Sequence, residues 1–444
     1  MMPPASHSAP DPGPEPIGAM LARMRLARGL SQPRLAELLC ATAGVPTVTR
    51  HEVSRWERQE RVPGAFWLGW LSLVLGVPRD RLEAAAASAH RRATVPGAPD
   101  PHLLWRPPRP GELLTALDGA GDGDLGTLAH IWLTGTALSG SASRVHPRPA
   151  GGHRGRPDGS GLGELRRMDD LVGGADLAAR VDRRLRTAIT ALPTAGGGRT
   201  LRLVAQWAQL AGWVHADAGD GTRARGAYRV GLRAAVTAGD HPLAVHVLGC
   251  ASYLHLWAGD ARRALLLART ASAGAGGRTP ATVRALALQR VALASALAGE
   301  RGAAQAALAA SERAVERARP GREPAWLYWL DEAELAAMTG RCLVVLGRPV
   351  RAVPLLAGHR RRAGPRTAAL YGGWLARAYC DLGEVERACE LAADAWTDAV
   401  RAGSVRVAAV LRRVDAVLLR HRDVPAVREY ERLARAATRY LPSP

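Results

Sequence analysis

The sequence of 444 residues contains no lysine and no asparagine. All 60 basic residues are therefore arginine, and against 40 acidic residues they give a formal net charge of +20. A charge of this size suits a polyanionic partner such as nucleic acid. However, exclusive use of arginine is also typical of a GC-biased genome. Residues 1–95 hold 12 arginines against 8 acidic residues, a net charge of only +4, so the charge favours nucleic-acid binding only weakly.

Cysteine is scarce, and no two cysteines form a CxxC pair. Their odd number and wide spacing argue against a disulfide or zinc framework, so we expect reduced thiols at Cys40, Cys250, Cys342, Cys380 and Cys389. Long apolar runs are also absent, since the longest, near residues 66–77, is too short to span a membrane. Residues 1–16 are proline-rich, without the basic start and apolar run of a signal peptide. We therefore expect a soluble, cytoplasmic protein with a disordered N-terminus and no membrane partner.

Patterns that indicate catalysis are weak throughout. Residues 121–126 match GxGxxG, but no strand precedes them, which argues against a dinucleotide site. Asp118, Asp122 and Asp124 lack the spacing and the terminal glutamate of a calcium-binding EF-hand loop. No Ser-His-Asp or Cys-His arrangement stands out. We therefore expect a protein that is not an enzyme and that has no cofactor and no metal site.

Residues 49–58 have the pattern of a short helix with a strong start. Thr49 is a favourable N-cap, and Glu52 three residues later completes the S/T-x-x-E capping box. Val53 and Trp56 are three residues apart and share one face, which we expect to pack inward. The opposite face then carries the polar residues of this helix.

The outward face of this helix is suited to DNA. Arg50, His51 and Arg55 point away from the apolar face, and two of them lie in the first turn. Guanine presents two acceptors in the major groove that match an arginine fork, so a first turn rich in long donors is what base reading requires. The flanking sequence predicts four more helices, which begin near Ile17, Ser31, Phe66 and Pro78. Together they predict a five-helix domain over residues 17–92.

Residues 17–85 resemble the lambda-repressor/Cro-like helix-turn-helix family, called XRE. The resemblance is carried by the residues at 30–32, 35–36, 53–57 and 75–77. It implies that Arg50, His51 and Arg55 contact bases and that Gln32 contacts a phosphate. The DNA-binding residues that we expect are Gln32, Thr49, Arg50, His51, Ser54, Arg55 and Arg58. Residues 40–48 depart from the family by being longer than its tight turn, so we expect the second helix to extend into them.

The middle of the chain has less pattern. Residues 93–163 are predicted to be a linker, proline-rich at first, with a weak helix at 113–138. Residues 139–163 are of low complexity and basic, which predicts a flexible segment.

A repeat begins near residue 200. Five glycines, each at the end of an apolar stretch, are spaced 40, 40, 48 and 36 residues apart; they are Gly219, Gly259, Gly299, Gly347 and Gly383. An alanine stands five residues after each glycine, and a small residue stands seven residues before each. Twelve residues after, four of the five positions are small, with His359 the exception. Small residues at fixed places allow successive helices to approach closely, which is the logic of a helical solenoid.

The repeats resemble the tetratricopeptide repeat (TPR) over residues 200–400, with a longer period and without the usual proline after the second helix. We expect an all-α chain in which a TPR-like α-solenoid occupies residues 164–444, with a terminal cap at 405–440. In this repeat the first helix of each hairpin lines a concave groove. The residues that we expect to face it are Gln206, Gln209, Trp213, Asp217, His246, Tyr253, Trp257, Gln289, Glu334, Arg341, Arg377 and Asp381. Within this set, Arg341 and Arg377 are suited to a carboxylate and the aromatic residues to a peptide.

The joined architecture resembles peptide-responsive regulators of Gram-positive bacteria and XRE–TPR regulators of actinobacteria. It implies a transcription regulator that binds an operator in double-stranded DNA and senses a peptide, protein or small molecule. The two-fold symmetry that is usual for operators implies a homodimer. The alternative from the sequence is a TPR adaptor that scaffolds protein partners without reading DNA; an antitoxin-like repressor suits so long a solenoid poorly.

Overall fold

The computed structural model describes residues 17–43, 47–92, 107–119, 124–139, 161–192, 197–276, 279–318, 321, 323–360 and 364–441. Their regular structure is helical and includes no strand, which confirms the predicted all-α class. The disordered N-terminus predicted for residues 1–16 and most of the flexible segment predicted for 139–163 lie outside these residues. The chain divides into two compact units, residues 1–104 and residues 105–444.

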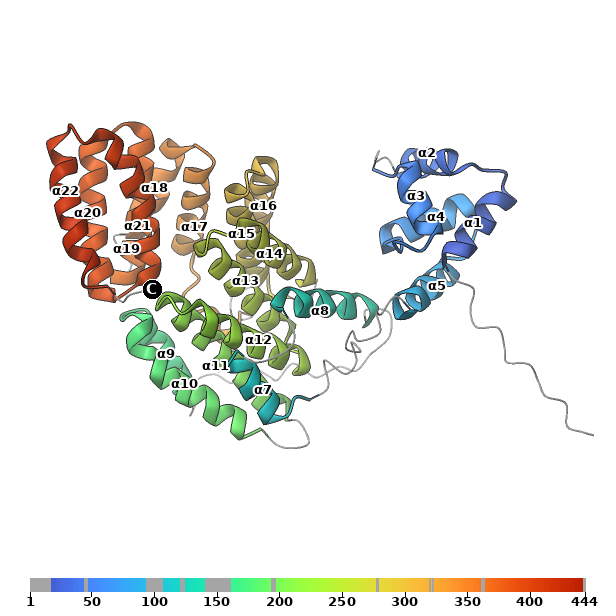
Figure 1. Cartoon of the computed structure of the whole chain (residues 1–444), viewed down its shortest axis with the longest axis horizontal. Helices are drawn as coiled ribbons and strands as arrows, with labels where there is room; N and C mark the ends of the chain where they lie inside the picture. The colour runs from blue at the N-terminus through green and yellow to red at the C-terminus, as the bar shows by residue number, and fades with distance from the viewer. Residues whose placement is uncertain are drawn as a thin grey trace, which may run out of the picture. The chain divides into compact units, whose positions relative to one another are not determined.

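The described residues of the first unit form five helices, as the sequence predicts (Figure 1). They are α1 (Ile17–Ala27), α2 (Gln32–Ala43), α3 (Arg50–Glu57), α4 (Ala65–Leu75) and α5 (Arg79–Arg92). Local capping fixes their ends: Gly29 and Gly76 have φ of +63° and +53° after α1 and α4, and the Ser31 hydroxyl accepts from Arg34 N–H at 3.2 Å. Apolar side chains from all five helices form one buried cluster.

The long connection between α2 and α3 is partly helical. Helix α2 extends through Ala43, as expected, and so takes up the first residues of the 40–48 segment. The Cys40 thiol donates to the Val48 carbonyl oxygen at 3.2 Å, and the Val48 side chain is buried. Residues 44–46 lie outside the described residues. The far end of the segment is therefore fixed to α2 and to the core just before α3 begins.

Helix α3 is held against α1 by close backbone contact and by charge. A side chain at Gly18 would overlap the carbonyl oxygens of Trp56 and Glu57, so only glycine permits this approach. Beside it, the Arg25 guanidinium donates to Glu57 at 2.5 and 3.1 Å and to the Leu30 carbonyl oxygen at 2.6 Å. These contacts on the inner face of α3 fix the direction in which its outer face points.

The second unit is a succession of antiparallel helices (Figure 1). They are α7 (Pro110–Leu117), α8 (Leu125–Ser139), α9 (Leu162–Asp169), α10 (Gly174–Thr190), α11 (Gly198–Asp217), α12 (Gly221–Thr237), α13 (His241–Trp257), α14 (Ala261–Gly274), α15 (Ala281–Leu297), α16 (Arg301–Val315), α17 (Glu332–Val345), α18 (Pro349–Arg360), α19 (Pro365–Leu382), α20 (Val385–Ala402), α21 (Val405–Leu418) and α22 (Pro425–Thr438), with short 3₁₀ turns η1 (Ala325–Leu327) and η2 (Leu419–His421). Five consecutive hairpins run from α11 to α20, and each helix packs most closely on its neighbours in the chain.

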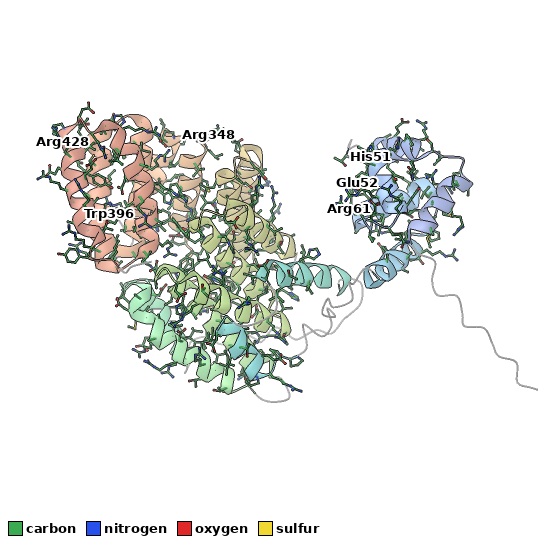
Figure 2. All side chains as sticks on the ribbon, viewed as in Figure 1. His51, Glu52, Arg61, Arg348, Trp396 and Arg428 are labelled. Carbon is green, nitrogen blue, oxygen red and sulfur yellow. The ribbon has the colours of Figure 1, made fainter. Side chains whose placement is uncertain are left out.

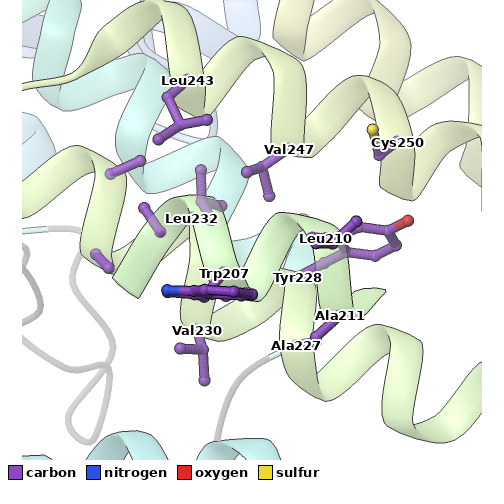
Figure 3. Packing of buried hydrophobic residues seen from close by; sticks show 14 of the residues in the cluster. Trp207, Leu210, Ala211, Ala227, Tyr228, Val230, Leu232, Leu243, Val247 and Cys250 are labelled. Carbon is purple, nitrogen blue, oxygen red and sulfur yellow. The ribbon is translucent and has the colours of Figure 1, made fainter. Parts of the chain in front are cut away.

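The repeat positions found in the sequence are the points of closest helix contact. All five hairpin glycines have positive φ, between +71° and +88°. The alanine that follows each of them by five residues is 0% exposed in every repeat, and these are Ala224, Ala264, Ala304, Ala352 and Ala388. A side chain at Gly212 would overlap the Tyr228 ring, and one at Gly340 would lie 2.9 Å from Leu356 Cγ. Figure 3 shows the same tight packing between α11, α12 and α13.

The structure corrects the expectation for residues 93–163. The weak helix predicted at 113–138 is two helices, α7 and α8, separated at residues 118–124. Both belong to the second unit, where α7 packs on α10 and α12 and α8 packs on α12 and α14. Leu113 and Trp132 are buried in its core, at 0% and 1% exposure. Residues 110–117 and 125–139 are therefore packed elements of the second unit and not part of a linker.

The second unit also closes on itself, which an open solenoid does not do. The Arg366 guanidinium donates to both oxygens of Asp169 at 2.8 and 2.9 Å, joining α19 to α9. Asp217 at the end of α11 pairs with Arg406 at 3.0 Å and accepts from the Ser404 hydroxyl at 2.7 Å. We call these five residues the closing cluster. It joins Asp217 to Ser404, which is 187 positions away in the chain, and Asp169 to Arg366, which is 197 positions away.

None of the described helices combines the length and the hydropathy that crossing a membrane requires.

Candidate functional site

The outward face of α3 is the first candidate site. Helix α3 begins as predicted, with the Thr49 hydroxyl accepting from Glu52 N–H at 3.4 Å. Val53 and Trp56 are buried, at 1% and 3% exposure. The predicted DNA-binding residues Thr49, Arg50, His51, Arg55 and Arg58 are all exposed, whereas Ser54 and Gln32 are half-buried.

Acidic side chains lie among the arginines of this face. Glu52 does not complete the predicted capping box; its carboxylate instead pairs with Arg61 at 2.8 Å and with Arg55 at 3.5 Å. Arg58 pairs with Glu60 at 3.0 Å. His51, Glu52 and Arg61 lie along one side of the unit in Figure 2. Because these pairs are exposed, each contributes little stability, and an anionic partner can displace them.

Gln32 has a structural partner at the edge of this face. Its amide nitrogen donates to the Glu57 carboxylate at 2.7 Å, and the same carboxylate holds Arg25. This bond uses one of the two amide N–H groups and orients the other. The phosphate contact expected of Gln32 stays a prediction.

A cavity of about 310 Å³ inside the second unit is the second candidate site. Its wall comes mostly from the first helix of each hairpin, α11, α13, α15, α17 and α19, together with α9, α21 and the turn at η1. Of the groove residues expected from the sequence, six line this cavity: Gln209, Trp213, His246, Tyr253, Glu334 and Arg341.

The other expected groove residues do not line the cavity, and their contacts show why. Arg377 pairs with Asp381 at 2.9 Å along the outside of α19, so it does not join Arg341. Trp257 packs edge-on against Tyr253, with ring centroids 5.1 Å apart. Gln289 is buried and donates to the Thr339 hydroxyl at 3.0 Å. Asp217 belongs to the closing cluster, and Gln206 accepts from Arg166 at 3.2 Å.

Basic residues are the main feature of the cavity that the sequence pattern does not reveal. Five arginines line it, against three acidic residues; the arginines are Arg166, Arg290, Arg341, Arg366 and Arg406. Arg366 and Arg406 are paired within the closing cluster. Among the acidic residues, Asp170 accepts from the Tyr328 hydroxyl at 2.6 Å and Glu334 from the Tyr371 hydroxyl at 2.5 Å. The repeat pattern predicts only Arg341 among them, and arginine is so common in this chain that no local pattern distinguishes the other four.

Planar side chains cover much of the remaining wall. The Trp213 and Tyr253 rings are stacked, with centroids 5.9 Å apart and planes 10° apart. His246 stacks on Trp326 with centroids 4.5 Å apart, and Arg406 lies over Trp213 at 4.2 Å. Flat, partly charged surfaces of this kind favour a flat ligand.

Burial keeps the nucleophilic groups of the wall neutral. Burial, together with the positive charges of Arg290 and Arg166, lowers the pKa of His246 to about 3. Burial likewise raises the pKa of the Cys250 thiol to about 11. At neutral pH these two groups therefore add no charge to the cavity.

Within the described ranges, no group of three or more histidine, cysteine, aspartate or glutamate side chains is arranged to hold a metal ion. All five cysteines are free thiols. Comparison with protein-family models, with curated proteins and with solved structures found no match to this chain.

Proposed function

We propose that the protein is a sequence-specific DNA-binding transcription regulator with an effector-sensing second unit. The observation that carries the proposal is α3: a capped helix with two buried anchors, Val53 and Trp56, and an outer face bearing Arg50, His51 and Arg55. In this proposal the first unit is a helix-turn-helix domain of the lambda-repressor type, and α3 enters the major groove.

The chemistry of this face supports base reading. Arginine offers a planar fork of donors that matches the two acceptors of guanine. Arg55 and Arg58 are paired with carboxylates at 3.5 and 3.0 Å, and because both arginine side chains are exposed, these pairs are easily exchanged for acceptors on DNA. Thr49, Arg58 and Gln32 would then contact the backbone and set the register, while Arg50, His51 and Arg55 read bases.

The second unit is proposed to be a TPR-like repeat domain that senses an effector, dimerises, or does both. Its cavity is the support for sensing, because a concave space lined by charged and aromatic side chains is typical of ligand sites. A homodimer would place two α3 helices about one helical turn of DNA apart. The proposed location of the protein is the cytoplasm.

Alanine substitution of the α3 arginines tests the proposal. Arg50→Ala and Arg55→Ala should each weaken binding to the duplex that the wild-type chain selects by about 1–3 kcal/mol, and relax the preference for one base pair. Arg81→Ala, an exposed arginine on α5, is the control and should leave the base preference intact. Binding to selected and scrambled duplexes is measured by fluorescence anisotropy. Unchanged base preference in both α3 variants would count against the proposal.

One observation favours a second candidate, an adaptor that scaffolds protein partners. Three arginines on or just after α3, at positions 55, 58 and 61, are paired with Glu52 or Glu60, which reduces the positive charge offered to DNA. An adaptor would bind DNA without base preference, and its binding would fall steeply with salt.

A further inference from the structure

Arg290 on α15 is a buried cation without a protein counter-charge. It is 3% exposed, and among the described residues its guanidinium forms neither a hydrogen bond nor an ion pair. Its guanidinium instead makes a cation–π contact with the Tyr253 ring, whose centroid lies 4.2 Å from Arg290 Cζ. Placing a charge in a protein interior is costly unless a partner compensates it. The cavity wall therefore contains an uncompensated positive charge.

Arg341 on α17 stands beside it and is also incompletely paired. It is 2% exposed, and its Nη1 donates to the Tyr253 hydroxyl at 2.7 Å. Its Nε and Nη2 have no hydrogen-bond partner in the described part of the chain. Both nitrogens are screened from solvent, so Arg341 acts on the cavity through its charge rather than through this edge of its guanidinium. Arg341 lies 5.1 Å from the Tyr253 centroid, so both cations flank the same ring.

Arg290 and Arg341 lie close enough to repel each other, because both guanidiniums flank the Tyr253 ring. Burial lowers the pKa of Arg290, and the positive charge of Arg341 lowers it further. Arg366 and Arg406, by contrast, are compensated by Asp169 and Asp217. An anion placed between Arg290 and Arg341 would supply the missing counter-charge.

The size and lining of the cavity limit what such an anion can be. A volume of about 310 Å³ is roughly twice that of a cavity of ~150 Å³ that accepts benzene. This volume accommodates a molecule of about two rings. Trp213, which is stacked on Tyr253, is the less buried of the two rings and is suited to a flat apolar body.

We propose that the cavity binds a small aromatic carboxylic acid, with its carboxylate between Arg290 and Arg341 and its ring along the Trp213–Tyr253 wall. As a binding site this stands on the geometry of the second unit alone. As the effector site of a regulator it rests on the proposed function.

The first test compares a charged probe with a neutral one of similar shape. 2-Naphthoate and 2-naphthalenemethanol are titrated into the full chain by calorimetry, in the absence of DNA. The acid should bind roughly tenfold to hundredfold more tightly than the alcohol, since only the acid compensates the two guanidiniums. 2-Naphthyl phosphate, titrated in parallel, should bind less tightly than the acid, because its larger headgroup must fit beside the same two buried guanidiniums.

The second test separates a ligand contact from a structural role. Arg290→Met should abolish the preference for the acid and should raise the melting temperature of the ligand-free chain by a few degrees, because it removes a buried charge that nothing compensates. Arg284→Met, on the same helix but away from the cavity wall, is the matched control and should change neither quantity.

Three results would overturn the inference: equal or absent binding of acid and alcohol by the wild-type chain, tighter binding of the phosphate than of the acid, or a lower melting temperature in Arg290→Met. The comparison of probes on the wild-type chain holds even if a variant fails to fold. Because no DNA is present, loss of the DNA-binding proposal leaves these measurements intact. A chain that selects an operator but ignores the acid would reject only the ligand class.

Discussion

His246 lies on α13 inside the second unit, where it stacks on Trp326 and is 5% exposed. Its imidazole is within 4.0 Å of the Cys250 thiol, and Arg290 and Arg166 act on it from neighbouring helices. An unfolded chain would give this histidine its ordinary pKa of about 6.5. Burial lowers the pKa in the folded state to about 3, so folding and protonation of His246 oppose each other.

The predicted consequence is a loss of stability in acid. Between pH 6.5 and about 3 the unfolded state binds a proton that the folded state does not, so stability falls as the pH is lowered through this window. The contribution of His246 is at most about 1.4 kcal/mol for each pH unit. His246→Phe should flatten the pH dependence by that amount in urea unfolding at a series of pH values. His421→Phe, an exposed position, should not, and an unchanged slope in His246→Phe would contradict the account.

At the scale of elements, the position of α3 depends on how closely α1 approaches its end. Gly18 on α1 lies against the carbonyl oxygens of Trp56 and Glu57, and Gln59, at φ +60°, follows the helix in a left-handed turn. The Arg25–Glu57 pair lies beside this contact, with side chains only 10% and 8% exposed. The packing of α1 against the backbone at the end of α3 therefore determines how the outer face of α3 is oriented.

Gly18→Ala should destabilise the first unit by about 1–3 kcal/mol, because the added methyl group overlaps backbone atoms that cannot move independently. Hydrogen–deuterium exchange of α1 and α3 in the full chain measures this as faster exchange in both helices. Gly69→Ala is the matched control within α4, where the nearest atom is Arg79 Nη1 at 3.7 Å. It should slow exchange by improving helix propensity. Unaltered exchange of α1 in Gly18→Ala would refute the contact.

Elements with local determinants could be predicted from the sequence, and those fixed at long range could not. Thr49, Ser31 and the repeat glycines act on neighbouring residues, so their effect is visible in the sequence. The prediction that Glu52 completes the capping box was wrong, because the Glu52 carboxylate pairs with Arg61 instead. Helices α7 and α8 were taken for linker because the apolar surface that covers them comes from α10, α12 and α14, far along the chain.

At the scale of the whole molecule, the closing cluster determines the shape of the second unit and hence its cavity. Burial raises the pKa of Asp217, but Arg406, Arg366 and the Ser404 and Gly174 hydrogen bonds outweigh it, and the net pKa is lowered. Asp217 thus stays ionised and paired. The repeats can be predicted from the sequence, but the closing cluster cannot, because its partners stand as many as 197 residues apart in the chain. For the same reason the first helices of the hairpins were predicted to line the site, but of its five arginines only Arg341 was predicted.

Arg366→Met should cost the second unit about 3–5 kcal/mol, because it leaves the buried carboxylate of Asp169 without its partner and weakens the compensation of Asp217. Urea unfolding of the full chain measures the loss. Arg387→Met removes an exposed pair with Glu390 and should cost less than about 1 kcal/mol. Equal effects of the two substitutions would mean that the closing cluster does not stabilise the unit.

The central claim is that α3 reads a DNA sequence, and selection from random duplex DNA tests it most directly. The purified full-length chain is offered a random pool at near-physiological salt, and the bound duplexes are sequenced. The account predicts an enriched motif, with two half-sites about one helical turn apart if the protein is a dimer. Binding that enriches no sequence and that falls steeply with salt would contradict it, because the arginines would then act only as counter-charge to phosphate.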